Sequence, residues 1–322
     1  MISKEIFNPI LSGLRNVEKR LDDFATTSEL PLLSELLAHT FKSKGKRTRP
    51  ALTLLTSGFH THDKSKVILM ATAVEMLHVA TLIHDDIVDE ANTRRGRITV
   101  SNAWGNHTAV LLGDYVFAAS ATYVCDTGNI RVVKLFSETI MDLSRGELQE
   151  SAHAHRNAYH IDEYLERIHF KTGSLFATAG ESGAILSGAS ESEVTALKNY
   201  SHKLGLAFQI IDDIMDFKSD AAFIGKPVGQ DIYNGVVTLP LIYESEKPKS
   251  KILIDDFLQR SNDKDLHKKI LASVNAGDSL NRAYKFAEDL MAQACNELDI
   301  FPDNTYRQSL VALAQLVLKR DY

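Results

Sequence analysis

The stretch VILMATAVEMLHVATLIHDDIVDE, from Val67 to Glu90, decides the fold class. Its apolar residues recur at helical spacing and lie most of the way round the helix, which is typical of a helix buried in the centre of a fold. Similar patterns predict further helices at Leu30–Phe41, His107–Cys125, Val132–Ser151, Asp162–Leu186, Glu191–Asp216 and Leu280–Leu298. Because alternating strand patterns are nearly absent, the sequence predicts an all-α protein.

The same stretch ends in an acidic motif that occurs twice in the chain. Asp85-Asp86-Ile87-Val88-Asp89 spaces its aspartates as Asp212-Asp213-Ile214-Met215-Asp216 does. On a helix, positions i and i+4 share a face, so the first and last aspartates of each motif project together. Carboxylates this dense repel each other unless cations neutralise them, and Mg²⁺ binds through one or two carboxylates plus substrate phosphates. We therefore expect a Mg²⁺–diphosphate site held between two helices.

The composition is that of an ordinary soluble protein, with 44% hydrophobic and 24% charged residues. A net charge of −6 without a basic stripe argues against nucleic acid as a partner. Cys125 and Cys295 lack metal-ligand spacing, so we expect buried small apolar residues in a reducing, cytoplasmic setting. The N-terminal residues lack the apolar stretch of a signal peptide, and the sequence shows neither a clean membrane span nor a Pro/Gly/Ser-rich linker. We expect one soluble all-α domain over residues 1–322, with no integral membrane segment.

Basic residues flank both acidic motifs. Arg94 and Arg95 follow the first motif closely, the segment Lys44–Pro50 precedes it, and Lys226 lies in a turn-rich loop after the second. Arginine and lysine side chains are the usual partners of phosphate oxygens, although a basic run alone usually serves surface solubility. Metal ions bound by these carboxylates would need an anionic ligand to bridge them. We therefore favour phosphate binding as the role of the basic residues.

Further polar residues stand on predicted helices. His78 lies seven residues, about two turns, before Asp85 and so on roughly the same face, unless it is an ordinary core histidine. Lys171-Thr172 lies in an apolar run, where a lysine needs an anion as partner. Gln209 lies one turn before Asp212. These positions make all four side chains candidates for the same site.

Six motifs, taken in order, resemble those of a known family. They are GKRTRP, HVATLIHDDIVDEANTRRG, KTGSLF, FQIIDDIMDF, GKPVGQD and TLP, which cover Gly45 to Pro240. In this order and spacing they resemble the trans-isoprenyl diphosphate synthases (polyprenyl synthetases), and specifically the long-chain members that are similar to octaprenyl diphosphate synthase. The resemblance implies an all-α isoprenoid-synthase bundle of many helices around a deep central cavity, usually a homodimer.

The resemblance also implies roles for individual residues, three Mg²⁺ ions per active site, and isopentenyl diphosphate and an allylic diphosphate as substrates. The positions that match metal-binding residues, directly or through water, are Asp85, Asp86, Asp89, Asp212, Asp213 and Asp216. Those that match contacts of isopentenyl diphosphate are Lys46, Arg49, His78 and Arg95. Those that match contacts of the allylic diphosphate are Arg94, Lys171, Thr172, Gln209 and Lys226. The catalytic candidates are Asp85, Asp89, Asp212, Lys171, Thr172 and Gln209.

The implied reaction is a head-to-tail condensation. Mg²⁺ and cationic side chains draw charge onto the leaving diphosphate, so that the allylic C–O bond ionises. The double bond of isopentenyl diphosphate attacks the carbocation, and a proton is lost to the released pyrophosphate. Apolar walls exclude water, which would quench the cation. No serine or cysteine stands beside a base, so the sequence offers no protein nucleophile.

Product length in this family follows from the depth of the tunnel that holds the growing chain. Ala80 and Thr81, five and four residues before Asp85, are small, whereas aromatic residues there would close the tunnel early. We therefore expect a long product, from hexaprenyl to decaprenyl, with octaprenyl as the central value. The alternatives are close helix packing at Ala80 and Thr81 with a larger residue truncating the tunnel elsewhere, and a short-chain enzyme that makes farnesyl or geranylgeranyl diphosphate.

Two positions depart from the family pattern, and two other functions compete with a synthase. Lys44 replaces a usual glycine, and Val236 stands where many members place a lysine near the allylic diphosphate. A class I terpene cyclase is disfavoured, because such cyclases usually carry asparagine and serine in the second metal motif. A non-catalytic subunit of a heteromeric synthase is disfavoured, because such subunits typically lose aspartates or cations that this chain keeps. The sequence leaves open whether the product enters quinone side chains or another pathway.

Overall fold

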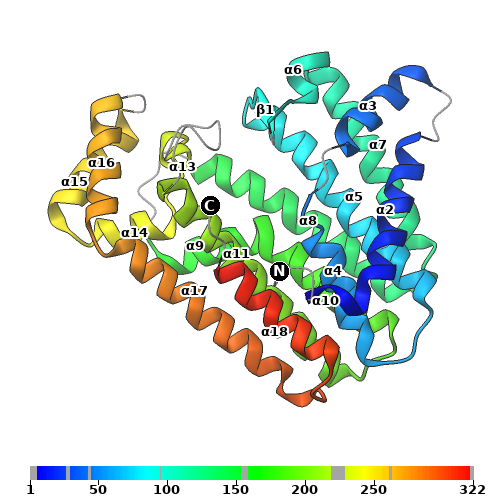
Figure 1. Ribbon diagram of the computed structural model, residues 1–322. Coiled ribbons are helices and arrows are strands. Elements are labelled where there is room, and N and C mark those ends of the chain that lie inside the picture. The colour runs from blue at the N-terminus through cyan, green and yellow to red at the C-terminus, as the bar shows by residue number, and fades with distance from the viewer. Residues whose placement is uncertain are drawn as a thin grey trace. The chain divides into compact units, whose positions relative to one another are not determined.

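The computed structural model describes residues 6–26, 30–42, 45–94, 96–153, 159–218, 229–260 and 263–319 (Figure 1). Up to residue 125 the helices are η1 (Asn8–Ile10), α2 (Leu11–Thr26), α3 (Pro31–Phe41), α4 (Thr48–Thr56), η2 (Ser57–Phe59), α5 (Lys64–Val88), α6 (Val100–Trp104) and α7 (Asn106–Cys125). From residue 130 they are α8 (Ile130–His153), α9 (Ile161–Ile168), the π-helix η3 (His169–Gly173), α10 (Ser174–Leu186), α11 (Glu191–Lys218), α13 (Gln230–Tyr233), α14 (Leu239–Ser245), α15 (Pro248–Gln259), α16 (Lys264–Ala276), α17 (Ser279–Asn296), η4 (Glu297–Ile300) and α18 (Thr305–Leu318). The predicted all-α class is confirmed.

The chain divides into two compact units. The first comprises Met1–Glu138, Thr178–Lys198 and Phe301–Leu310, and the second comprises Thr139–Ala177, Asn199–Ile300 and Val311–Tyr322. Apolar side chains are buried in both. The expectation of a single domain over the whole chain stays a prediction.

Helix α5 is the core helix of the first unit. It packs against α2, α4 and α7 (Figure 1), and every residue from Met70 to Leu77 is buried. Its start is fixed by Asp63, whose Oδ1 accepts a 2.9 Å hydrogen bond from the Ser65 backbone N–H. A Cβ at Gly113 in α7 would lie 2.1 Å from Nε2 of His84, so this close helix contact depends on glycine. The prediction of a central helix over this stretch is confirmed.

The only strands among the described residues form a short antiparallel hairpin in the same unit. β1 (Thr93–Arg94) pairs with β2 (Arg97–Ile98), with Thr93 opposite Ile98 and Arg94 opposite Arg97. Strands this short leave no alternating pattern in the sequence, so the hairpin is not predictable from periodicity.

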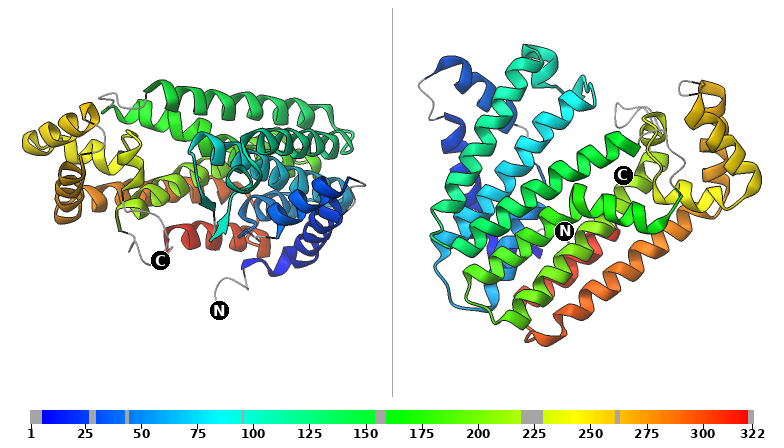
Figure 2. Two further views of the ribbon diagram at one scale, coloured as in Figure 1. Left: turned by 90° about the horizontal axis from the view of Figure 1, so that it is seen from above. Right: turned by 180° about the vertical axis from the view of Figure 1, so that it is seen from behind.

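In the second unit, α14 packs against α9, α15, α16 and α17, and α15 lies beside α16 (Figure 2). Its buried Glu244 accepts hydrogen bonds from Ser250 and Ser273, both at 2.7 Å, from Ser279 at 3.1 Å and from Lys247 at 2.9 Å. One buried carboxylate thus connects α14 to α15, α16 and α17.

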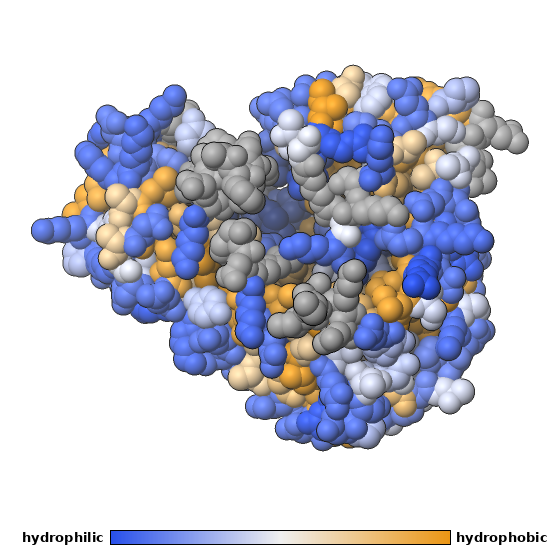
Figure 3. All heavy atoms as spheres, viewed as in Figure 1, coloured by the Kyte–Doolittle hydropathy of each residue, from blue (hydrophilic) through white to orange (hydrophobic). Residues whose placement is uncertain are grey.

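Exposure corrects one expectation about the cysteines. The prediction that both are buried is wrong for Cys125, the last residue of α7, which is exposed because its neighbour Val124 takes the buried position. Cys295 is half-buried, and both thiols are free. On the face drawn in Figure 3, hydrophilic residues predominate and hydrophobic residues gather in smaller patches.

Two helices, α5 and α7, are long and apolar enough to cross a membrane by length and composition alone. The most apolar window of α5 is 61% buried, as in the core helix of a soluble protein, so the evidence for a membrane span is weak.

Candidate functional site

The first acidic motif occupies the C-terminal end of α5. Asp85 is half-buried, Asp86 is buried, and the C-cap residue Asp89 is exposed. The Asp89 backbone N–H donates to the Asp85 carbonyl at 2.8 Å, so their side chains project one helical turn apart, as predicted. The C-terminal end of a helix carries partial negative charge, which adds to the repulsion among the carboxylates. This end of α5 is therefore suited to binding cations.

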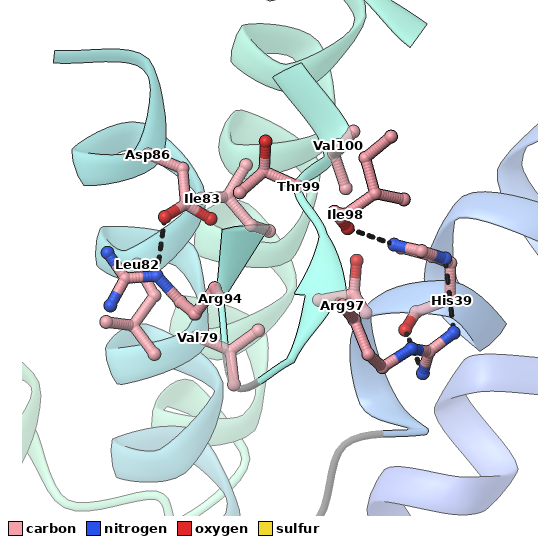
Figure 4. Close-up of a pocket in the computed structure, with 11 residues that line it drawn as sticks. His39, Val79, Leu82, Ile83, Asp86, Arg94, Arg97, Ile98, Thr99 and Val100 are labelled. Atoms are coloured by element: carbon pink, nitrogen blue, oxygen red, sulfur yellow. Dashed lines mark hydrogen bonds and ion pairs between the residues drawn. The ribbon is translucent and has the colours of Figure 1, made fainter. Parts of the chain in front are cut away.

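A cationic side chain lies against this motif. Arg94 in β1 pairs with Asp86, with 2.5 Å between Nε and Oδ1 (Figure 4). A carboxylate and a guanidinium at the same point can serve a metal ion and a phosphate group respectively. Arg95, the next residue of the hairpin, lies outside the described residues.

The predicted contacts of isopentenyl diphosphate are distributed over α4 and α5. Lys46 is exposed just before α4, Arg49 is half-buried in its first turn, and His78 is half-buried on α5. Arg47, between the two basic candidates, instead pairs with Glu18 and Glu75. Its side chain is 10% exposed, so this arginine ties α4 to α2 and α5 rather than facing solvent.

The second acidic motif lies near the end of α11, and its three aspartates have different surroundings. Asp212 is half-buried. Asp213 is buried and accepts hydrogen bonds from Tyr164 Oη at 2.7 Å and from Gln209 Nε2 at 2.8 Å. Asp216 accepts the backbone N–H groups of Gln230 and Asp231 at 3.1 and 3.0 Å. Asp216 therefore also caps the short helix α13.

Lys171 and Thr172 lie in the π-helix η3, an irregularity that frequently marks functional positions. Lys171 Nζ lies 2.5 Å from Glu150 Oε1, so the prediction that this lysine has an anionic partner is confirmed. Thr172 Oγ1 donates to Gln209 Oε1 at 2.6 Å, and the amide of Gln209 continues to Asp213. The structure thus brings three of the predicted residues, Thr172, Gln209 and Asp213, into one hydrogen-bonded network.

Sequence reasoning assigned no role to three residues beside this network. Tyr164 bonds Asp213, and Arg167 donates from Nη2 to the carbonyl of Val237 at 2.6 Å. Asp231 was within a recognised motif, but Tyr164 and Arg167 carry no local signal because their partners are distant in sequence. Lys226 lies outside the described residues.

Burial and neighbouring carboxylates raise the pKa of two side chains in this acidic cluster. Burial raises the pKa of the Asp213 carboxyl from 3.8 to about 6, although hydrogen bonds from Tyr164 and Gln209 and the charge of Arg167 oppose the shift. Burial and the charges of Asp216 and Asp213 raise the pKa of Asp231 well above its ordinary value. Additional positive charge would relieve both effects.

The carboxylates of the two acidic motifs are suitable ligands for Mg²⁺, provided that a bound substrate completes the coordination of the metal. Carboxylate oxygens are the ligands that Mg²⁺ prefers, and both motifs supply them. In the described part of the chain, no three His, Cys, Asp or Glu side chains converge so as to hold a metal ion. Coordination through a few carboxylates together with phosphate oxygens is the arrangement that these residues permit.

The predicted product-length residues lie one turn and more before Asp85 on α5. Ala80 is 1% exposed, and Thr81 is half-buried, with its Oγ1 donating to the His78 carbonyl at 2.9 Å. Their role in product length stays a prediction.

Comparison with known proteins gives consistent matches over nearly the whole chain. Residues 30–274 match the family described as polyprenyl synthetase. Heptaprenyl diphosphate synthase component 2 of Geobacillus stearothermophilus is 34% identical over 319 residues, which is 99% of each chain.

Solved structures agree with the sequence match. The heptaprenyl diphosphate synthase of Staphylococcus aureus superposes with a TM-score of 0.92 at 34% identity, covering 97% of this chain and 98% of that one. A polyprenyl synthase of Caulobacter crescentus CB15, complexed with calcium and isoprenyl diphosphate, gives a TM-score of 0.92 at 28% identity, covering 99% of this chain and 98% of that one.

Proposed function

Because the chain belongs to the polyprenyl synthetase family, we propose that it is a prenyltransferase that condenses isopentenyl diphosphate with an allylic diphosphate, such as farnesyl diphosphate. Repeated condensation would give a long-chain all-trans polyprenyl diphosphate. The observation that carries the proposal is the pair of acidic motifs with their polar neighbours. Arg94 pairs with Asp86 of the first motif, and Thr172 and Gln209 form a hydrogen-bonded chain to Asp213 of the second. Lys171, next to Thr172, adds a cation that pairs with Glu150. Carboxylates with adjacent cations suit metal ions and diphosphate together.

The residues of the second unit would act on the allylic substrate. Lys171 and Lys226 would hold its diphosphate, and Asp212 would bind the metal directly. By the family resemblance, Arg94 of the first unit matches a further contact of this diphosphate. Asp213 and Asp216 would support the metal through water. Thr172 and Gln209 present dipoles rather than nucleophiles, and their mutual hydrogen bond of 2.6 Å fixes both side chains.

The residues of the first unit would bind metal and the second substrate. Asp85 and Asp89 would be metal ligands with Asp86 in support, and the diphosphate of isopentenyl diphosphate would contact Lys46, Arg49, His78 and Arg95. Three Mg²⁺ per active site, when bound, would stabilise the negative charge that develops on the leaving diphosphate. The protein residues orient both diphosphates and exclude water from the carbocation.

A long product, near octaprenyl, is supported by the small side chains of Ala80 and Thr81. The heptaprenyl relative is itself a long-chain synthase by name. A short-chain product is the alternative, and a second alternative follows from the name of that relative, a "component 2", which suggests that this chain could require a partner subunit.

A homodimer is our proposal for the assembly, because α7 exposes the apolar side chains Val110, Leu111 and Tyr115. Burial of such a face in a second copy would remove apolar surface from water. We place the protein in the cytoplasm, since both cysteines are free thiols.

A product assay tests the function. Purified protein is incubated with farnesyl diphosphate, excess isopentenyl diphosphate and Mg²⁺, and product lengths are read by mass spectrometry, with EDTA as control. We expect a Mg²⁺-dependent ladder that ends near octaprenyl. The Asp85→Asn variant should lose about a hundredfold in rate or more, whereas Asp289→Asn, at an exposed side chain of α17, should not. A single addition would exclude the long-chain product, and no turnover would favour the non-catalytic subunit.

A further inference from the structure

We propose that His39 is a positioning residue for diphosphate binding, a role that rests on the proposed function. Together with Arg97, it fastens the Thr93–Ile98 hairpin to the end of α3, so that Arg94 stays beside Asp86. Neither His39 nor Arg97 is among the residues to which the family resemblance gives a role.

The hairpin cannot hold its own orientation. Each of its strands has two residues, and an isolated two-stranded ribbon is marginally stable in water at best. Its position therefore depends on contacts with the neighbouring helices. One contact is the ion pair from Arg94 to Asp86 on α5.

At the base of the hairpin, Thr99 also bonds the carbonyls of Asn92 and Ala91. The contact with α3 is a reciprocal set of hydrogen bonds from the second strand. His39 Nε2 lies 2.9 Å from the Ile98 carbonyl, Arg97 Nη1 donates to the His39 carbonyl at 3.1 Å, and Arg97 Nη2 lies 3.3 Å from His39 Nδ1 (Figure 4). A guanidinium only donates and a carbonyl only accepts. The network therefore assigns the donor role to Nε2 and the acceptor role to Nδ1.

The position of His39 in its helix strengthens this connection. It lies in the last turn of α3, where backbone carbonyls lack partners within the helix and carry partial negative charge. Arg97 supplies both a donor and a positive charge at this end. The imidazole is packed edge-to-face against Trp104, with 4.9 Å between ring centroids.

Substrate binding affects the two anchors of the hairpin, Arg94–Asp86 and His39–Arg97, differently. A pocket of about 80 Å³ separates them, and Asp86, Arg94, Arg97 and His39 all line it. A diphosphate that binds Arg94 competes with Asp86 for the same guanidinium, which weakens the first anchor. The His39–Arg97 anchor does not use Arg94, so it can hold the hairpin while Arg94 engages substrate. Without the His39–Arg97 anchor, the entropy cost of ordering the hairpin would oppose substrate binding. The affinity for diphosphate would then be lower, and the chemical step would be unchanged.

Two variants at one position separate this role from general packing. His39→Leu keeps the apolar bulk against Trp104 but removes both hydrogen bonds of the ring. His39→Gln carries an amide N–H that can reach the Ile98 carbonyl. We expect His39→Leu to raise the KM of the allylic diphosphate about fivefold or more, since each of the two lost hydrogen bonds contributes up to about that factor, with little change in kcat. His39→Gln should recover most of the affinity, and His160→Leu, at an exposed histidine just before α9, should match the wild type.

A second measurement does not require turnover. Trp104 is the only tryptophan of the chain, so intrinsic fluorescence reports directly on the ring that packs against His39. Titration with inorganic pyrophosphate and Mg²⁺ should give a weaker affinity for His39→Leu, by the same factor as the change in KM, and an altered Trp104 emission.

The outcomes distinguish the two proposals. If the wild type is active but His39→Leu and His39→Gln have the same KM and the same pyrophosphate affinity as each other, the positioning role alone is overturned. A lower Tm in His39→Leu with unchanged KM shows a purely structural contact and also overturns it. A wild type that transfers no prenyl group overturns the proposed function, and the positioning role with it.

Discussion

Tyr164 donates a hydrogen bond of 2.7 Å from its Oη to Oδ2 of Asp213, and both residues are buried. This hydrogen bond and the one from Gln209 favour the charged carboxylate, whereas burial disfavours it. Burial prevails, because the pKa of Asp213 is raised to about 6. The second acidic motif therefore holds a carboxylate whose charge is costly until a cation arrives.

Asp213→Asn should stabilise the metal-free protein at neutral pH and impair catalysis. Below the ordinary pKa of 3.8 both folded and unfolded states are protonated, and Asp213 contributes its full stability. As pH rises through about 6 the folded state loses this proton, so that contribution is lost. With EDTA at about pH 8, we expect Tm to rise by roughly 2–4 °C, which about 1 kcal/mol produces in larger domains. Activity should fall about tenfold or more, as for other supports of metal ligands.

The pH dependence is the critical part of that measurement. The Tm difference between Asp213→Asn and wild type should shrink towards zero at about pH 4. Asp289→Asn, at an exposed carboxylate of α17, serves as the matched control. A Tm difference that does not vary with pH would contradict the assignment of this charge to Asp213.

Glu244 presents the opposite case, a buried carboxylate whose charge is well supported. Hydrogen bonds from Lys247, Ser250, Ser273 and Ser279 outweigh the effect of burial and lower its pKa below 4.5. Its contribution to stability is therefore present above pH 4.5 and is lost as pH falls through the folded-state pKa. Glu244→Gln should reduce the free energy of unfolding at neutral pH by about 1–3 kcal/mol, because it removes the charge and leaves donors in place.

Urea unfolding as a function of pH checks this effect. The stability difference should diminish in acid, where the wild-type carboxylate is also protonated. Glu288→Gln, at a half-exposed glutamate of α17 whose side chain is 42% exposed, should change stability by less than about 0.5 kcal/mol. Equal effects of the two substitutions would contradict the role of the four donors around Glu244.

Arg167 connects α9 to the loop before α14. Its side chain is 13% exposed, and Nη2 bonds the Val237 carbonyl at 2.6 Å while its charge favours ionised Asp213. Arg167→Gln should therefore raise the KM of the allylic diphosphate by about tenfold, the scale of a lost charged hydrogen bond. Val236→Lys, which introduces the lysine that the family resemblance places near the allylic diphosphate, should recover part of the loss when combined with Arg167→Gln.

Steady-state kinetics with varied allylic substrate provides the test. Arg145→Gln is the matched control, because Arg145 pairs with Glu166 on α9 but its side chain is 59% exposed. If both arginine variants show the wild-type KM, Arg167 has only a local structural role.

The sequence allowed correct prediction where the signal was local and repeated. The apolar run that forms α5 ends in the first acidic motif. At the start of α11, the Ser190 backbone N–H donates to Glu193 Oε2 at 2.8 Å, a pairing that follows from the three-residue spacing of serine and glutamate. Both depend on spacing within about a turn or two of helix.

Features that depend on distant partners could not be predicted. The requirement for an anion at Lys171 followed from its apolar surroundings, but Glu150 as that anion did not. The serines that surround Glu244 come from three different helices. The π-helix and the hairpin lack a period of their own, so composition gives no sign of either.

Ala80→Phe and Thr81→Phe should each shorten the product if these positions line the tunnel. An aromatic ring on α5 would occupy the space that a growing chain needs, so the longest product should shift by one or more isoprene units. Because Ala80 is 1% exposed, phenylalanine there also risks overpacking, at a cost of about 1–3 kcal/mol. Thr81 is half-buried, so phenylalanine at this position tests the effect on product length with less overpacking. Product lengths by mass spectrometry should be measured beside Tm, with Leu32→Phe, at an exposed position of α3, as control. Folded Ala80→Phe and Thr81→Phe variants that both keep the wild-type ladder would place the tunnel floor on other residues.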